Sequence, residues 1–475
     1  MKTHLLSALM IATVLVLISG QGSAAAKTAD PQPHSAENPL RDSLPDQWEL
    51  EQQFFQTAPD EDNWWKSFSD PELESLIQQA VANNFNILTA IRRIETAAQN
   101  QRYTKSGYYP SLGISGGWNR EMTSTTVHGE HPHESTISYF HLGLTANWEI
   151  DIFGRIRAKL KADKANYDAS VAEYDATMIS LCSNVAKAYF QLRQEQMLVK
   201  IAEETVKIVE EQKLLADARY EAGLRPLLDV VQARMSIAQT RSALPQHKAN
   251  VRTALNQIAM LVGVYPEKLE ALLNPRELPE IPAPGNIGTP ETLLRRRPDI
   301  VAAEKQLAAM AAQVGIAKKD FLPTLSVSAA VGSQVHTFKD LYGPDSYYYS
   351  VVPSLTWSIF EGMARNAKLA EARLNMEAQI DSYNQTVMNA VSEVNNAMIA
   401  LKSLQEQQIY QEILLKEARK QLELQTDRFL QGLTGFSDIA GSQATVLQYE
   451  NSLVQLKASQ LAGVVTLYTA LGGGY

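Results

Sequence analysis

Cysteine is almost absent from this chain of 475 residues, and basic residues do not dominate it. The one cysteine, Cys182, excludes an internal disulfide and a metal cluster built on thiolates. The formal net charge of -9 argues against a nucleic-acid partner, because such proteins need a basic face that displaces counterions from phosphates. The sequence therefore argues against a disulfide-rich protein and against a nucleic-acid-binding protein.

Long apolar runs are missing beyond the first 26 residues. Residues 1–26 read as a secretory signal peptide, with an apolar stretch from Leu5 to Ile18 and small residues before Lys27. We expect no lipid anchor, since no cysteine stands there to accept acyl chains. After Lys27 no apolar run reaches the roughly 18 residues of a spanning helix, so a membrane span would have to use strands.

Catalytic signatures are also missing. The chain has no phosphate-binding glycine loop, no nucleophile with a plausible base nearby and no paired acids in a pocket-like context. The sequence predicts no enzyme and no cofactor.

The chain contains the same plan twice. Tyr220 to Val230 aligns without a gap on Phe429 to Ile439, at a shift of 209 residues (429 − 220 = 209). The repeats are placed at 72–263 and 291–472, after an N-terminal segment at 27–71, with a proline-rich linker at 264–290 between them. Each repeat reads as helix, strand, turn, strand, very long helix, turn, helix.

The long helices are predicted from Gly154 to about Tyr220 and from about Ala364 to Phe429. No proline interrupts the first, which would measure about 100 Å at 1.5 Å per residue. Small residues recur along it with spacings of four and three, which is typical of a coiled-coil seam: Ala158, Ala162, Ala165, Ala169, Ala172 and Ala176.

Four segments alternate between apolar and polar residues with a period of two, as strands do. The apolar face is predicted to meet lipid through Phe140, Leu142, Leu144, Trp148, Leu355 and Trp357. Half of a soluble sandwich would alternate equally well. Four strands cannot close a barrel, since the smallest membrane barrels need about 8, so other copies would have to supply the rest. Three copies would give twelve strands.

Three kinds of motif recur in one known family: an N-terminal segment, a mid-chain arginine motif and two helix–turn–helix tips, which are Trp64 to Leu73, Leu293 to Ile300, and Tyr220-x-x-Gly223 with Phe429-x-x-Gly432. Through them the chain resembles the TolC-like outer-membrane factor family, in its NodT-type branch serving resistance-nodulation-division pumps. The arginine motif also reads as a solvated helix end before a new helix at Asp299, and Trp64 and Trp65 as packing anchors.

The resemblance implies a mainly α duplicated fold. Long antiparallel coiled-coil helices would form an α-barrel, and four strands per chain would contribute to a 12-stranded β-barrel of a homotrimer. It further implies an exit duct in the outer membrane of a Gram-negative bacterium. The duct would conduct small molecules passively and would dock to a periplasmic adaptor and an inner-membrane transporter.

The resemblance also implies a periplasmic gate at the tips. Its residues would be Asp229 and Asp438, with Phe436 and Arg225 adding bulk or ion pairs, although each aspartate would equally suit the start of a return helix. A second acid three positions on is missing, since Gln232 and Gly441 stand there. The turn residues Gly223, Leu224, Gly432 and Leu433 are the expected adaptor contacts.

The histidines His128, His131 and His133 lie between the first two strands. They could bind zinc or copper, although a loop without fixed partner ligands is more often simply polar. Two other functions stay open. A conduit for protein secretion would share the fold, and a periplasmic coiled-coil adaptor would share the helices but lack the strands.

Overall fold

The computed structural model describes residues 63–123, 135–282 and 295–473, all within the unit Pro45–Tyr475. The signal peptide, the three loop histidines and part of the linker lie outside these residues. The elements of the first half are η1 (Trp64–Phe68), α3 (Pro71–Asn83), α4 (Phe85–Ser106), β1 (Ser111–Thr123), β2 (Ser135–Ile150), α5 (Arg155–Glu221) and α6 (Leu227–Val262).

From α4 onward, the second half repeats this order after the short helix η3 (Pro266–Leu273). Its elements are α8 (Pro298–Lys319), β3 (Thr324–Val335), η4 (Phe338–Asp340), β4 (Tyr347–Thr356), α9 (Ala364–Leu430) and α10 (Phe436–Ala470). The long helices α5 and α9 both have 67 residues, and the return helices α6 and α10 have 36 and 35. The mainly helical, duplicated fold predicted from the sequence is confirmed.

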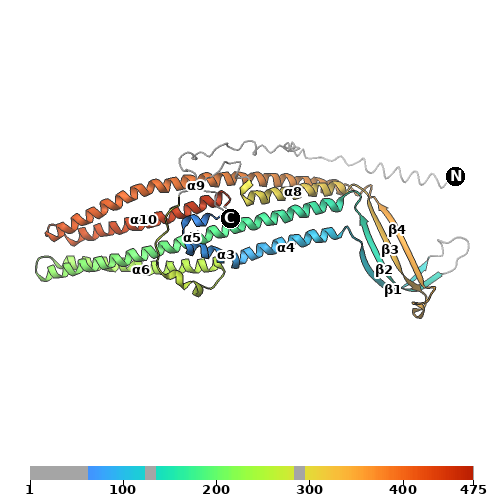
Figure 1. Cartoon of the computed structure of the whole chain (residues 1–475), viewed down its shortest axis with the longest axis horizontal. Helices are drawn as coiled ribbons and strands as arrows, with labels where there is room; N and C mark the ends of the chain where they lie inside the picture. Colours follow the sequence, from blue (N-terminus) through green and yellow to red (C-terminus); the bar gives the residue numbers. More distant parts are fainter. Residues whose placement is uncertain (1–62, 124–134, 283–294, 474–475) are drawn as a thin grey trace, which may run out of the picture. The chain divides into compact units, whose positions relative to one another are not determined.

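Each long helix packs antiparallel against the return helix that follows it, so α5 lies beside α6 and α9 beside α10 (Figure 1). Helix α5 also lies along α4, α8 and α10. Four of the six seam alanines of α5, Ala162, Ala165, Ala169 and Ala172, are buried. Their small side chains allow the close approach of neighbouring helices. Within the described residues, no helix has the length and apolar character needed to cross a bilayer.

The starts of α3 and α5 are fixed by side chains that accept hydrogen bonds from free backbone N–H groups. The Asp70 carboxylate accepts from the amides of Glu72 and Leu73 at the start of α3. For α5, the two oxygens of Asp151 accept from the amides of Ile156 and Arg157, both at 3.0 Å.

The mid-chain motif is a buried junction from Arg297 onward, so its reading as a solvated helix end is wrong for Arg297, whereas Arg295 and Arg296 are exposed. Arg297 is buried, pairs with Asp299 and Glu393 at 2.6 and 2.8 Å, and donates to the carbonyl of Ala470 at the end of α10. A cation suits that position because the last carbonyls of a helix carry partial negative charge. The motif therefore connects α8, α9 and α10.

The N-terminal tryptophans are packing anchors, as the sequence suggests. Trp64 and Trp65 are buried, and the Trp64 ring stacks on Tyr468 with centroids 5.9 Å apart. Nearby, the buried guanidinium of Arg193 in α5 pairs with Glu72 and donates to the Asn274 carbonyl at 3.0 Å. These contacts join α3, α5 and the segment after η3.

The four strands form one antiparallel sheet in the order β1-β2-β3-β4. Paired residues share a face, so the registers Ile114↔Leu144 and Leu325↔Leu355 align apolar side chains across the sheet. Five of the six predicted lipid-facing residues are exposed in the single chain: Leu142, Leu144, Trp148, Leu355 and Trp357.

Two details of the sheet differ from the prediction. Phe140 is half-buried, because its ring packs against Phe338 with centroids 5.6 Å apart. Trp357 lies one residue beyond the end of β4. Its indole N–H donates to the Phe321 carbonyl at 3.1 Å, and Trp148 makes the matching bond to Tyr108 at 3.0 Å. Both tryptophans thereby fasten a strand to the turn that precedes the neighbouring strand.

Candidate functional site

The candidate site lies where each long helix reverses into its return helix. Gly223 and Gly432 have φ values of 70° and 79°, in the left-handed region that glycine adopts without strain. After each glycine a leucine amide bonds to the carbonyl five residues earlier, Leu224 to Arg219 and Leu433 to Arg428, both at 2.9 Å. This is the geometry of a Schellman motif, and it ends both helices in the same way.

The two turns pack against each other through a hydrophobic core that we call the tip cluster. Its buried members come from all four helices: Ala216, Val230, Ala233, Phe429, Phe436 and Ile439. The rings of Phe429 and Phe436 meet edge to face with centroids 6.2 Å apart. The first repeat is therefore fastened to the second at this end of the helices.

Two arginines of the first repeat reach across to the second. Arg219 donates to the carbonyls of Phe429 and Leu430 at the end of α9, the latter at 2.7 Å. Arg225 donates to the Thr434 carbonyl at 2.6 Å. Both guanidinium groups also lie over the Phe429 ring, 4.8 and 5.5 Å from its centroid. The cations thus meet the negative end of the α9 dipole.

Asp229 is the buried acidic residue of this contact between the two turns. It is only 3% exposed, and its Oδ2 pairs with Arg225 Nε at 2.7 Å. Its Oδ1 accepts from the backbone amide of Phe436, in the first turn of α10, at 3.2 Å. One carboxylate therefore binds its own turn and the helix start of the other repeat.

Asp438, which the repeat aligns with Asp229, lies in a different environment. Its side chain is exposed, and no ion pair joins it to another residue in the described ranges. The reason is the neighbouring position: Thr434 stands in the second repeat where Arg225 stands in the first. The alignment of the repeats predicts the same role for both aspartates. In the structure Asp229 is buried in an ion pair, whereas Asp438 is exposed.

The other predicted residues of the tips differ in their exposure to solvent. Phe436 is fully buried in the tip cluster, whereas Leu224 and Leu433 are 72% and 66% exposed. Sequence reasoning missed Arg219, although an arginine in the last turn before a predicted helix end is a signal for carbonyl binding.

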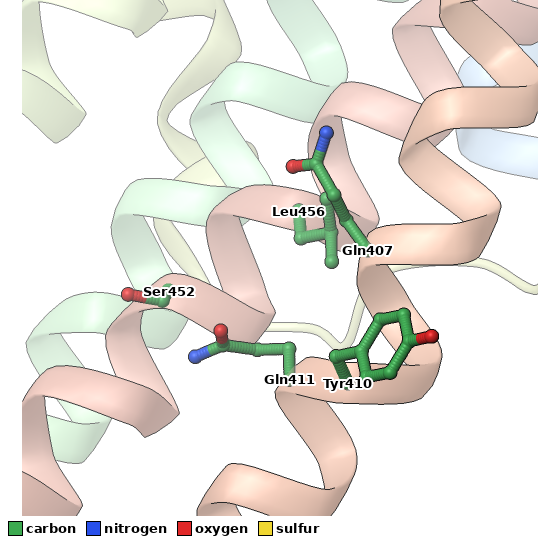
Figure 2. Close-up of a pocket in the computed structure, with 5 residues that line it drawn as sticks. All are labelled: Gln407, Tyr410, Gln411, Ser452 and Leu456. Carbon is green, nitrogen blue, oxygen red and sulfur yellow. The ribbon is translucent and has the colours of Figure 1, made fainter.

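No metal centre emerges within the described residues, where no group of three or more His, Cys, Asp or Glu could hold an ion. A small cavity of about 270 Å³ lies between α9 and α10, lined by Gln407, Tyr410, Gln411, Ser452 and Leu456 (Figure 2). Gln411 Nε2 donates to the Tyr449 carbonyl at 3.3 Å. The residues that line this cavity include no carboxylate, histidine or lysine.

The comparison with known proteins identifies the class. The family model for the outer membrane efflux protein matches residues 76–264 and 289–473, and the chain belongs to that family. Its fold is that of the outer-membrane channels of efflux systems.

Individual relatives agree with this assignment. The chain is 28% identical to the cation efflux system protein CusC of Escherichia coli, over 91% of this chain and 93% of the relative. It is 29% identical to the probable efflux pump outer membrane protein TtgC of Pseudomonas putida, over 88% and 86%. The solved outer-membrane channel OprN matches with 30% identity and a TM-score of 0.84, over 91% of this chain and 97% of that one.

Proposed function

We propose that three copies of this chain form the exit duct of a tripartite efflux pump in the outer membrane of a Gram-negative bacterium. The duct conducts small molecules from the periplasm to the outside and catalyses no reaction. The energy for export comes from an inner-membrane transporter of the resistance-nodulation-division class, to which a periplasmic adaptor connects the duct.

The observation that carries this proposal is the unfinished sheet. In the described part of the chain, β1 and β4 each pair with a strand on one side only. Unpaired N–H and C=O groups are costly in lipid, and the apolar face around Leu144 and Leu355 is exposed in the single chain. Pairing β1 of one copy with β4 of the next satisfies both edges, and three copies close a barrel of twelve strands.

The opposite face of the sheet suits a water-filled passage. Its residues include small and polar side chains such as Thr145, Ser326 and Ser350, and Ser328 Oγ donates to Asn147 Oδ1 at 2.9 Å. The helices would continue this passage as a tube, since α5 and α9 are each about 100 Å long.

The gate belongs to the same proposal. We assign the closed state to the contact between the two tips, in which Arg225 and Asp229 hold Phe436 at the start of α10. Opening then requires the tips of the two repeats to part, a rearrangement that adaptor binding would favour. In the trimer, exposed Asp438 would form the single acidic ring that prefers cations.

The exposed leucines of the tips are the proposed adaptor contacts. Leu224 and Leu433 each follow a left-handed glycine, so the rigid turns hold both apolar side chains out in the solvent. A photo-crosslinking residue at either position should capture the adaptor in cells. Leu214, which is 65% exposed on α5, is the matched control and should capture less.

Conduction is tested by reconstituting the purified protein into planar bilayers. We expect discrete conductance steps with a preference for cations, and loss of that preference in Asp438→Ala. Absence of any conductance from correctly folded protein, both in the wild type and in Arg225→Met, would overturn the proposed function.

A further inference from the structure

A groove of about 490 Å³ lies between the two repeats, and neither the duct nor the gate accounts for it. One wall comes from α5 with Glu204 and Ile208, and the other comes from α9 with Leu422 and Asp427. Helix α10 supplies the floor, which includes the buried residue Val446. The groove thus combines apolar surface with acidic groups on both walls.

Of the four carboxylates that line the groove, two are paired with a basic side chain. Glu450 is paired with Arg419 at 2.7 Å, and Glu423 with Lys420 at 2.9 Å. Glu204 and Asp427 have no ion pair among the described residues, and they lie on opposite walls. The local charge therefore favours a cationic occupant.

The floor supplies a second, independent observation. Gln443 lines the groove although it is only 5% exposed, and its Oε1 is buried without a hydrogen-bond partner among the described residues. The Oε1 of Gln212, which also lines the groove, is unpartnered in the same way. Buried polar groups are ordinarily satisfied, because an acceptor that loses water without gaining a partner destabilises the fold. A small adjustment of these side chains would let an occupant with N–H donors supply the missing bonds.

We propose that this groove binds a small organic cation with an apolar body and an ammonium or amidinium group. Its volume lies in the range of about 300–1,000 Å³ that is usual for small-molecule sites. A helical peptide would not fit, because three turns of a helix occupy roughly 1,300 Å³ at a diameter of about 10 Å and a rise of 1.5 Å per residue. The cavity of Figure 2 has no carboxylate and serves as an internal contrast.

A cation bound in this groove would affect how the two repeats pack against each other. The ligand touches α5 of the first repeat together with α9 and α10 of the second, so it stabilises the packing of the repeats as the structure has it. If the tips part when the duct opens, as proposed above, the same ligand opposes opening. Binding itself does not depend on that proposal.

The test uses the full-length protein, assembled as it is isolated and held in lipid nanodiscs. The probe is rhodamine 6G, a cation with an apolar ring system, and fluorescein is its anionic counterpart with the same ring system. Fluorescence anisotropy is measured against empty nanodiscs, which correct for dye held by lipid. We expect saturable binding of rhodamine 6G and none of fluorescein.

Substitutions in the groove test whether rhodamine 6G binds there. Glu204→Gln combined with Asp427→Asn should weaken rhodamine 6G binding at least tenfold, and Gln443→Met about threefold. Glu406→Gln combined with Glu417→Gln also removes two negative charges, from exposed positions of α9 outside the groove, and it should change the affinity less than twofold. Unchanged binding in the double variant, or equal binding of fluorescein, would overturn the proposal. Each variant's melting temperature establishes that it is folded.

Discussion

Replacing Arg225 by methionine removes one of the two arginine side chains that reach from the first tip to the second, and it leaves the Asp229 carboxylate buried without its partner. Breaking a buried ion pair on one side costs about 3–5 kcal/mol. The Asp229 side chain is 4% exposed and that of Arg225 is 18% exposed, so water still reaches the guanidinium. We therefore expect a loss near the lower end, about 3 kcal/mol, in the free energy that holds the tips together.

Hydrogen exchange of the Phe436 amide measures this loss directly, because that amide donates to Asp229. A change of about 3 kcal/mol corresponds to roughly 100-fold faster exchange, at about 1.4 kcal/mol for each factor of ten. In planar bilayers Arg225→Met should also raise the fraction of time that the duct is open.

Two further variants test whether the contact of Arg225 with Asp229 holds the tips together. Arg428→Met removes an exposed arginine from the last turn of α9 and should leave the exchange rate of Phe436 nearly unchanged. Adding Asp229→Asn to Arg225→Met should recover part of the loss, because the unpaired charge is gone. If Arg225→Met exchanges like the wild type or like Arg428→Met, the contact described here does not hold the tips.

Three further predictions concern single residues. Asp438→Ala should leave the melting temperature within about 1 °C while it reduces cation preference, whereas Asp229→Ala should lower stability by about 3 kcal/mol in a denaturant titration. Gly432→Ala should cost about 1–2 kcal/mol through its left-handed φ alone, since no atom lies within 4 Å of an added Cβ; an unchanged denaturation midpoint would contradict this. Burial raises the pKa of the Cys182 thiol to about 12, so maleimide should label it slowly at pH 8 in the folded protein and rapidly in guanidinium.

The helices and strands were predictable because they follow from local patterns. The absence of proline and the alanine spacing predict a helix from Gly154 to about Tyr220, and α5 spans Arg155–Glu221. Alternation likewise finds all four strands. It overextends β4 to Ile359, because the alternation of apolar residues continues past Thr356, the last residue of β4 that pairs with β3.

The candidate site was only partly predictable. The left-handed glycines and the exposed leucines follow from the turn chemistry of one chain segment. The burial of Asp229 and Phe436 depends on how the two turns face each other, which no local pattern contains. Arg297 shows the same limit, since its partners Glu393 and Ala470 lie about 100 and 170 residues further along the chain.

The mass of the native complex tests most directly whether copies of this chain complete one another's sheet. The protein is extracted from outer membranes in mild detergent and weighed by native mass spectrometry. We expect a stable assembly of three copies. A folded, stable monomer that stays in solution without detergent would contradict it.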